Sequence, residues 1–70
     1  MNTRPGHEAS VFQHFGPIQG GGNVSGWVGI VGHPASGEFI VKTCRGYDTA
    51  AAAGRELASL YADWCRKNPS

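Results

Sequence analysis

The side chains that could do chemistry in this 70-residue chain are few. They are three histidines and two cysteines: His7, His14, His33, Cys44 and Cys65. A structural zinc site usually needs closely spaced ligand pairs, of the form C-x₂-C or H-x₃₋₅-H. No two of these residues have such a spacing. We therefore expect no metal site and no other cofactor.

A cysteine nucleophile would need a histidine base beside it and donors for an oxyanion. Strand alternation predicts that Cys44 and His14 lie on one sheet face, but no segment supplies an oxyanion hole, and so small a chain rarely encloses a pocket. The run Gly20-Gly21-Gly22 lacks the Lys-Ser/Thr pair of a phosphate-binding loop, and no helix follows it. We expect a protein that is not an enzyme and has no catalytic residues.

The charge balance bears on the class of partner. Six basic and five acidic side chains give a net charge of +1. A dedicated nucleic-acid binder usually carries a clear basic excess, because neutralising phosphates supplies most of its affinity. The balanced charge therefore argues against nucleic acid as the main partner. Two cysteines and a polar start to the chain are typical of a cytoplasmic protein with reduced thiols, and no apolar run approaches the roughly 20 residues that span a bilayer.

The elements that must position these side chains are three strands and one helix. Alternating apolar and polar residues, separated by glycine- and proline-rich turns, predict strands over 10–15, 24–31 and 38–45. We expect a single α+β domain over 10–67, with a flexible N-terminal tail at 1–9 and a C-terminal tail at 68–70. The expected architecture is a three-stranded antiparallel sheet (β-β-β-α) with the C-terminal amphipathic helix packed on one face.

The helix has the clearest sequence signals. Asp48 or Thr49 can accept hydrogen bonds from the first turn, and the alanines at 50–53 favour helix strongly. At about 100° per residue the apolar side chains form one stripe. Its members are Ala50, Ala53, Gly54, Leu57, Leu60, Tyr61, Trp64 and Cys65. We expect Gly54 to let the helix backbone approach the sheet closely.

Because the helix covers one sheet face, the other face (the open face) should expose apolar residues. In the third strand, Glu38 and Lys42 mark the solvent side and place Ile40 with them. If Val28 and Ile30 of the second strand meet the helix, then Trp27 points to the open face. The resulting candidate residues for binding a partner are Phe12, His14, Trp27, Ile40, Lys42 and Arg45.

Three interpretations of this apolar face remain open. It could bind a partner or a second copy of the chain, since contiguous exposed apolar patches usually mark interaction sites. The N-terminal tail could instead fold across it. Or the alternation of the second strand could be inverted, which would place Trp27 and Val31 in the core beneath the helix with Trp64.

Residues 46–53, Gly-Tyr-Asp-Thr-Ala-Ala-Ala-Ala, resemble the strand-to-helix junction of Apetala-type and integrase-arm DNA-binding domains. In those domains a three-stranded sheet reads the major groove and one helix backs it. The resemblance implies a sheet-first DNA-binding domain, with Lys42 and Arg45 on phosphates or bases. The first two expected strands, however, contain none of the arginines and lysines that the family's sheet carries.

In size and architecture the chain also resembles small phage and mobile-element proteins, including anti-CRISPR proteins, which occlude a surface on a host protein complex. This resemblance implies a phage-type inhibitor or modulator, anchored by Trp27, Phe12 and Ile40 with Lys42 and Arg45 at the rim. Its partner would be a host protein or protein complex, and the open face could also form a homodimer. We rank this function first, DNA binding second, and an enzyme or metal protein last.

Overall fold

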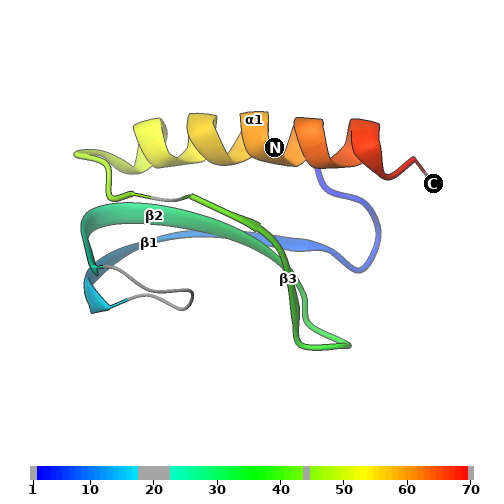
Figure 1. Ribbon diagram of the computed structural model, residues 1–70, viewed down its shortest axis with the longest axis horizontal. Helices are drawn as coiled ribbons and strands as arrows, with labels where there is room; N and C mark the ends of the chain where they lie inside the picture. Colours follow the sequence, from blue (N-terminus) through cyan, green and yellow to red (C-terminus); the bar gives the residue numbers. More distant parts are fainter. Residues whose placement is uncertain (1, 18–22, 44, 70) are drawn as a thin grey trace.

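The computed structural model describes residues 2–17, 23–43 and 45–69. Its elements, in chain order, are β1 (Glu8–Pro17), β2 (Asn23–His33), β3 (Glu38–Lys42) and α1 (Ala50–Lys67). The strands form an antiparallel sheet in the order β1-β2-β3, and α1 packs as a second layer on one face (Figure 1). The predicted α+β architecture is confirmed. No helix in this described part of the chain is long and apolar enough to cross a membrane.

The helix begins and ends where local chemistry favours it. Thr49 has an extended backbone and its hydroxyl accepts the Ala52 N–H at 3.1 Å, so Thr49 is the N-cap. Arg66 and Lys67 lie in the last turn, where positive charge is favourable. The Asn68 N–H then donates to the Trp64 carbonyl at 2.9 Å and closes the helix.

The core lies between α1 and the middle of the sheet. Val31, Leu57 and Tyr61 form its buried centre, with Ile40, Val41, Trp64 and Cys65 packed around them. Gly29 lies directly beneath the helix, since a Cβ there would be 2.9 Å from Leu57 Cδ2. A Cβ at Gly54 would meet nothing within 4 Å. The close approach of the two layers therefore depends on Gly29, and the prediction that Gly54 provides it is wrong.

The prediction of which β2 face meets the helix is also wrong. Val31 has no exposed surface and packs with Leu57, and Gly29 contacts the same leucine. Alternation places Trp27 on this helix side, and Val28 and Ile30 on the open face. The physical reason is that β2 is a central strand with apolar residues on both faces, so it has no polar marker of its solvent side.

A β-bulge reverses the expected faces of Phe39 and Ile40 in β3, whereas Val41 and Lys42 keep theirs. Val31 pairs with Val41, but the next β2 residue, Gly32, pairs with Phe39, so Ile40 is an extra residue in the ladder. Ile40 therefore packs against the core, whereas the structure leaves Phe39 52% exposed. The prediction that Ile40 shares the solvent side with Lys42 is wrong, because strict alternation fails across a bulge.

The N-terminal segment lies at the helix rather than across the open face. The Arg4 N–H donates to the Tyr61 hydroxyl at 2.9 Å, and His7 Nδ1 lies 2.7 Å from the same oxygen. The Arg4 guanidinium donates to the carbonyls of Cys65 and Asn68, at 3.2 and 2.6 Å. β1 already begins at Glu8, two residues earlier than predicted. The described part of this segment thus leaves the open face uncovered.

Candidate functional site

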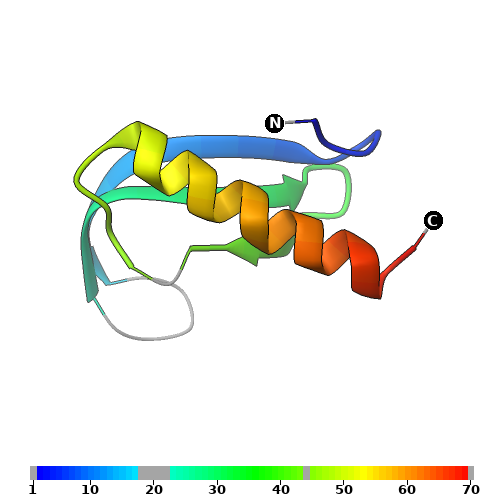
Figure 2. The same cartoon turned by 90° about the horizontal axis from the view of Figure 1, so that it is seen from above.

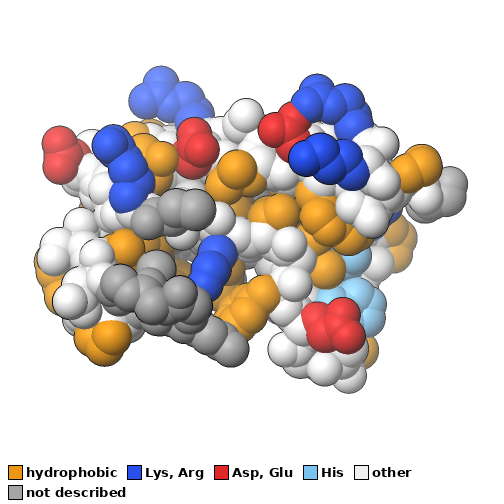
Figure 3. Space-filling model, viewed as in Figure 1, with side chains coloured by type: hydrophobic (Ala, Val, Ile, Leu, Met, Phe, Trp, Pro, Cys, Tyr) orange, Lys and Arg blue, Asp and Glu red, His pale blue; other side chains and the backbone are white. Residues whose placement is uncertain are grey.

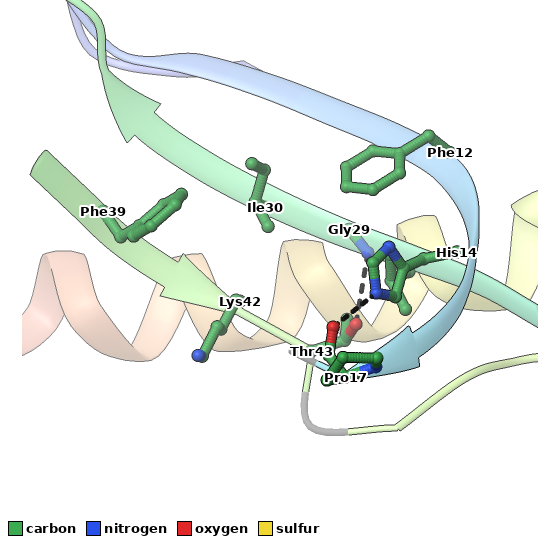
Figure 4. A pocket seen from close by; sticks show the side chains of 9 residues that line it. Phe12, His14, Pro17, Gly29, Ile30, Phe39, Lys42 and Thr43 are labelled. Carbon is green, nitrogen blue, oxygen red and sulfur yellow. Dashed lines mark hydrogen bonds between the residues drawn. The ribbon is translucent and has the colours of Figure 1, made fainter. Parts of the chain in front are cut away.

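The open face carries an apolar groove of about 220 Å³. All three strands contribute to it, and Figure 4 shows its side chains on the side of the sheet away from α1. The lining residues are Phe12, His14, Pro17, Val28, Gly29, Ile30, Phe39, Lys42 and Thr43. This groove is the candidate binding site.

The strand pairing explains how the groove is assembled. Phe12 of β1 lies directly opposite Val28 of β2, and Ile30 lies opposite Lys42 of β3. Val28 is only 6% exposed, whereas Phe12 and Phe39 are 38% and 52% exposed. The groove therefore has a well-packed valine at its base and two phenylalanine rings that reach solvent at its sides.

The polar groups at the groove are few and mostly engaged. His14 Nε2 lies 2.8 Å from the Pro17 carbonyl and must donate the hydrogen bond, since a carbonyl only accepts. The buried Thr43 hydroxyl accepts the Gly29 N–H at 3.1 Å. Lys42 contributes the positive charge among the lining residues. The site is thus an apolar surface with one imidazole and one ammonium group.

Cys65, the cysteine that the structure describes, does not line this groove. Cys44 lies outside the described residues, so its expected proximity to His14 has no structural counterpart here. Cys65 is a free, partly buried cysteine that packs against the helix core. Within the described ranges, no three histidine, cysteine, aspartate or glutamate side chains are grouped so that they could hold a metal ion.

Three of the predicted partner-binding residues come together at the groove: Phe12, His14 and Lys42. The rings of Phe12 and His14 are 6.5 Å apart, edge to face. The other three lie elsewhere. Ile40 belongs to the core, and Arg45 stacks 4.5 Å from the centre of the Tyr47 ring.

Trp27 lies on the helix side of β2 and is tied to the segment that precedes α1. Its backbone N–H and C=O both pair with Tyr47, at 2.8 Å each. The sequence predicted that the Trp27 side chain anchors a partner on the open face. In the structure this side chain is on the other sheet face, and the Trp27 backbone joins the segment around Tyr47 to the sheet.

Sequence reasoning missed Phe39, Val28 and Ile30 as groove residues. Phe39 could not be found by alternation, because the bulge at Ile40 reverses its side. For β2 there was one usable signal. A glycine between two β-branched residues is compatible with a helix crossing above it, and reading Gly29 in that way would have placed Val28 and Ile30 on the open face.

A second cluster, of aromatic rings, lies at the other end of the molecule. The His7 ring contacts those of His33, Tyr61 and Trp64 edge to face, with centroids 5.5 to 5.8 Å apart. Arg4 lies over the Trp64 ring at 5.4 Å. Sequence reasoning assigned His7 to a flexible tail. The cluster fixes the N-terminal segment on the helix and explains the position of His7 without a ligand.

Comparisons of the chain with protein-family models, with curated proteins and with solved structures gave no match.

Proposed function

We propose that this chain is a non-enzymatic protein-binding module that inhibits or modulates a host protein complex by occluding one of its surfaces. The groove on the open face is the contact site. The observation that carries this proposal is the pair of exposed rings, Phe12 and Phe39, on a sheet face that no described segment covers. Contiguous apolar patches rimmed by polar groups commonly mark protein interaction sites.

The energetics favour an apolar partner surface. Burying a phenylalanine side chain completely stabilises by about 1.5–3 kcal/mol, so covering the exposed parts of two rings contributes about 1–3 kcal/mol in all. Aromatic residues in well-packed, water-excluding contacts commonly dominate interface energies. Lys42 at the groove favours a partner that presents an acidic group beside its apolar side chain.

Sheet-first DNA binding is the second candidate function, behind protein binding, because of where the basic residues lie. Binding along a duplex needs several phosphate contacts from one face. In Figure 3 most lysine and arginine side chains gather over the helix layer rather than the sheet. Arg55, Arg66 and Lys67 belong to α1, and Arg4 lies against its Trp64. Among the residues that line the groove, Lys42 is the basic one, which is too few for this mode.

The test is affinity capture from a host lysate, with and without nuclease. We expect a nuclease-resistant protein partner that a Phe12→Ala/Phe39→Ala double variant no longer captures. The matched control is Phe15→Ala, because Phe15 is 69% exposed on β1 but lies on the opposite sheet face from Phe12. Capture that nuclease abolishes would favour DNA binding. Unchanged capture by a double variant with a wild-type melt would refute the groove as the site.

A further inference from the structure

No strand within residues 2–17, 23–43 and 45–69 pairs with the outer edge of β1. β1 has ten residues and lies at the margin of the sheet; the helix begins above β1 and crosses diagonally over β2 and β3 (Figure 2). Natural proteins usually shield such edges with lysines, prolines, bulges or short strands. β1 has no lysine or arginine, its proline is the last residue, and its pairing with β2 runs from Glu8 to Pro17 without a bulge.

The hydrogen bonds of β2 reveal which β1 groups face this edge. The N–H and C=O of Trp27 bond with the backbone of Tyr47. The Gly29 N–H donates to the Thr43 hydroxyl, and the Gly29 C=O accepts from the Thr43 N–H. These backbone groups of β2 therefore point away from β1. In an antiparallel ladder their β1 partners, Gln13 and Val11, are then non-hydrogen-bonded positions. Alternation along the continuous register gives one set of outward-facing residues: Ala9, Val11, Gln13 and Phe15.

The outward backbone groups of these four residues are complementary to those of the same four residues in a second copy of the chain. When a second β1 lies antiparallel so that Ala9 faces Phe15 and Val11 faces Gln13 of the other copy, every outward N–H and C=O finds a partner. Any other two-fold register leaves some of them unpaired. Four pairs that each exchange two hydrogen bonds give about eight. A standard protein interface has about ten.

The side chains fit the same register in size and in charge. The small residues Ala9 and Ser10 face the large residues Phe15 and His14 of the second copy. Glu8 lies diagonally across from that copy's His14, which brings a carboxylate near an imidazole on the open face. No like charges face each other. The two copies of Phe12 meet at the two-fold axis, where non-hydrogen-bonded residues approach most closely.

We propose that two copies of this chain pair through their β1 edges into one six-stranded sheet with both helices on the same face. The two-fold axis passes beside Phe12 and is perpendicular to the sheet. The two open faces therefore also lie on one side, and their grooves join at the paired Phe12 rings. The proposal rests on the free edge and its register, so it stands or fails independently of the proposed partner function.

Cysteine cross-linking tests the register directly, with both native cysteines replaced by serine. Phe12→Cys places two thiols across the axis, where the Cα atoms are about 4.5 Å apart, and this separation allows a disulfide. Gln13→Cys is the matched control, because its two copies are offset along the strands. We expect the Phe12→Cys dimer to form at least about tenfold faster. Equal rates, or faster cross-linking by Gln13→Cys, would overturn the register.

Sedimentation equilibrium tests the dimer itself. Gln13→Pro removes an outward N–H and leaves the pairing with β2 in place, and proline is tolerated on edge strands. We expect the wild type and Gln13→Ala to be dimers, and Gln13→Pro to be a monomer with a wild-type circular dichroism spectrum. A wild type that stays monomeric at about 1 mM would overturn the proposal. So would a folded Gln13→Pro that dimerises as well as Gln13→Ala. If Gln13→Pro does not fold, the wild-type mass and the cross-linking rates decide.

Discussion

Gly29 is the residue on which the distance between sheet and helix depends, and adding one methyl group there tests the packing. In Gly29→Ala the new Cβ would lie 2.9 Å from Leu57 Cδ2 and 3.2 Å from Leu57 Cβ. Carbon atoms pack best at about 3.5–4.0 Å. Leu57 is fully buried, so its side chain has little room to move. We expect overpacking to destabilise the fold by about 1–3 kcal/mol.

A double-mutant cycle with Leu57→Ala tests whether the destabilisation by Gly29→Ala arises from the contact with Leu57. Leu57→Ala alone should cost about 2–5 kcal/mol, because it leaves a cavity at the centre of the core. In the double variant the contacts of the new methyl with Leu57 Cδ2 and Cγ are removed and only the 3.2 Å contact with the Cβ of residue 57 remains, so the methyl partly fills that cavity. We therefore expect the two costs to be less than additive, by about 1–2 kcal/mol.

Urea unfolding followed by circular dichroism measures these differences. A 70-residue domain has a stability of roughly 4–10 kcal/mol, so an osmolyte such as TMAO is needed to keep Leu57→Ala folded at the start. The matched control is Gly32→Ala in the same strand, whose Cβ would meet only the Glu38 carbonyl, at 3.4 Å. Equal stability of the two single variants, or strict additivity with Leu57→Ala, would show that Gly29 does not set the interlayer distance.

Three further predictions concern stability and are each read from a thermal melt. Trp27→Ala should lower the free energy of unfolding by about 2 kcal/mol, since Trp27 lies on the helix side of β2. A wild-type melting temperature would indicate that Trp27 lies on the open face instead. Tyr61→Phe should cost about 1–3 kcal/mol, because the Arg4 N–H loses its acceptor and His7 its partner; no change would mean that this hydroxyl is dispensable. Thr49→Ala should cost about 1 kcal/mol and Thr49→Ser much less, and equal losses would argue against hydroxyl capping.

The sequence by itself determined the elements, because their signals are local. The alanine run, the Thr49 cap and the apolar stripe predicted a helix, which the structure has from Ala50 to Lys67 with Ala53, Leu57 and Tyr61 buried. Glycine- and proline-rich segments predicted that there are three separate strands, although β1 and β2 extend into these segments, to Pro17 and His33. Alternation in β1 placed Phe12 and His14 on one face, and both line the groove of the open face. Each of these predictions needs only neighbours within a few residues.

Only the tertiary structure decided which faces of β2 and β3 became the site. A central strand with apolar residues on both sides can present either side to the helix, and the contact of Gly29 with Leu57 selects one. The bulge at Ile40 depends on how β3 pairs with β2.

The position of the N-terminal segment also could not be predicted from the sequence, because it depends on contacts between residues far apart in the chain. Its hydrogen bonds join Arg4 and His7 to Tyr61, more than 50 residues away in the chain. Such contacts leave no periodic pattern in the sequence, because they form only after the helix has packed on the sheet.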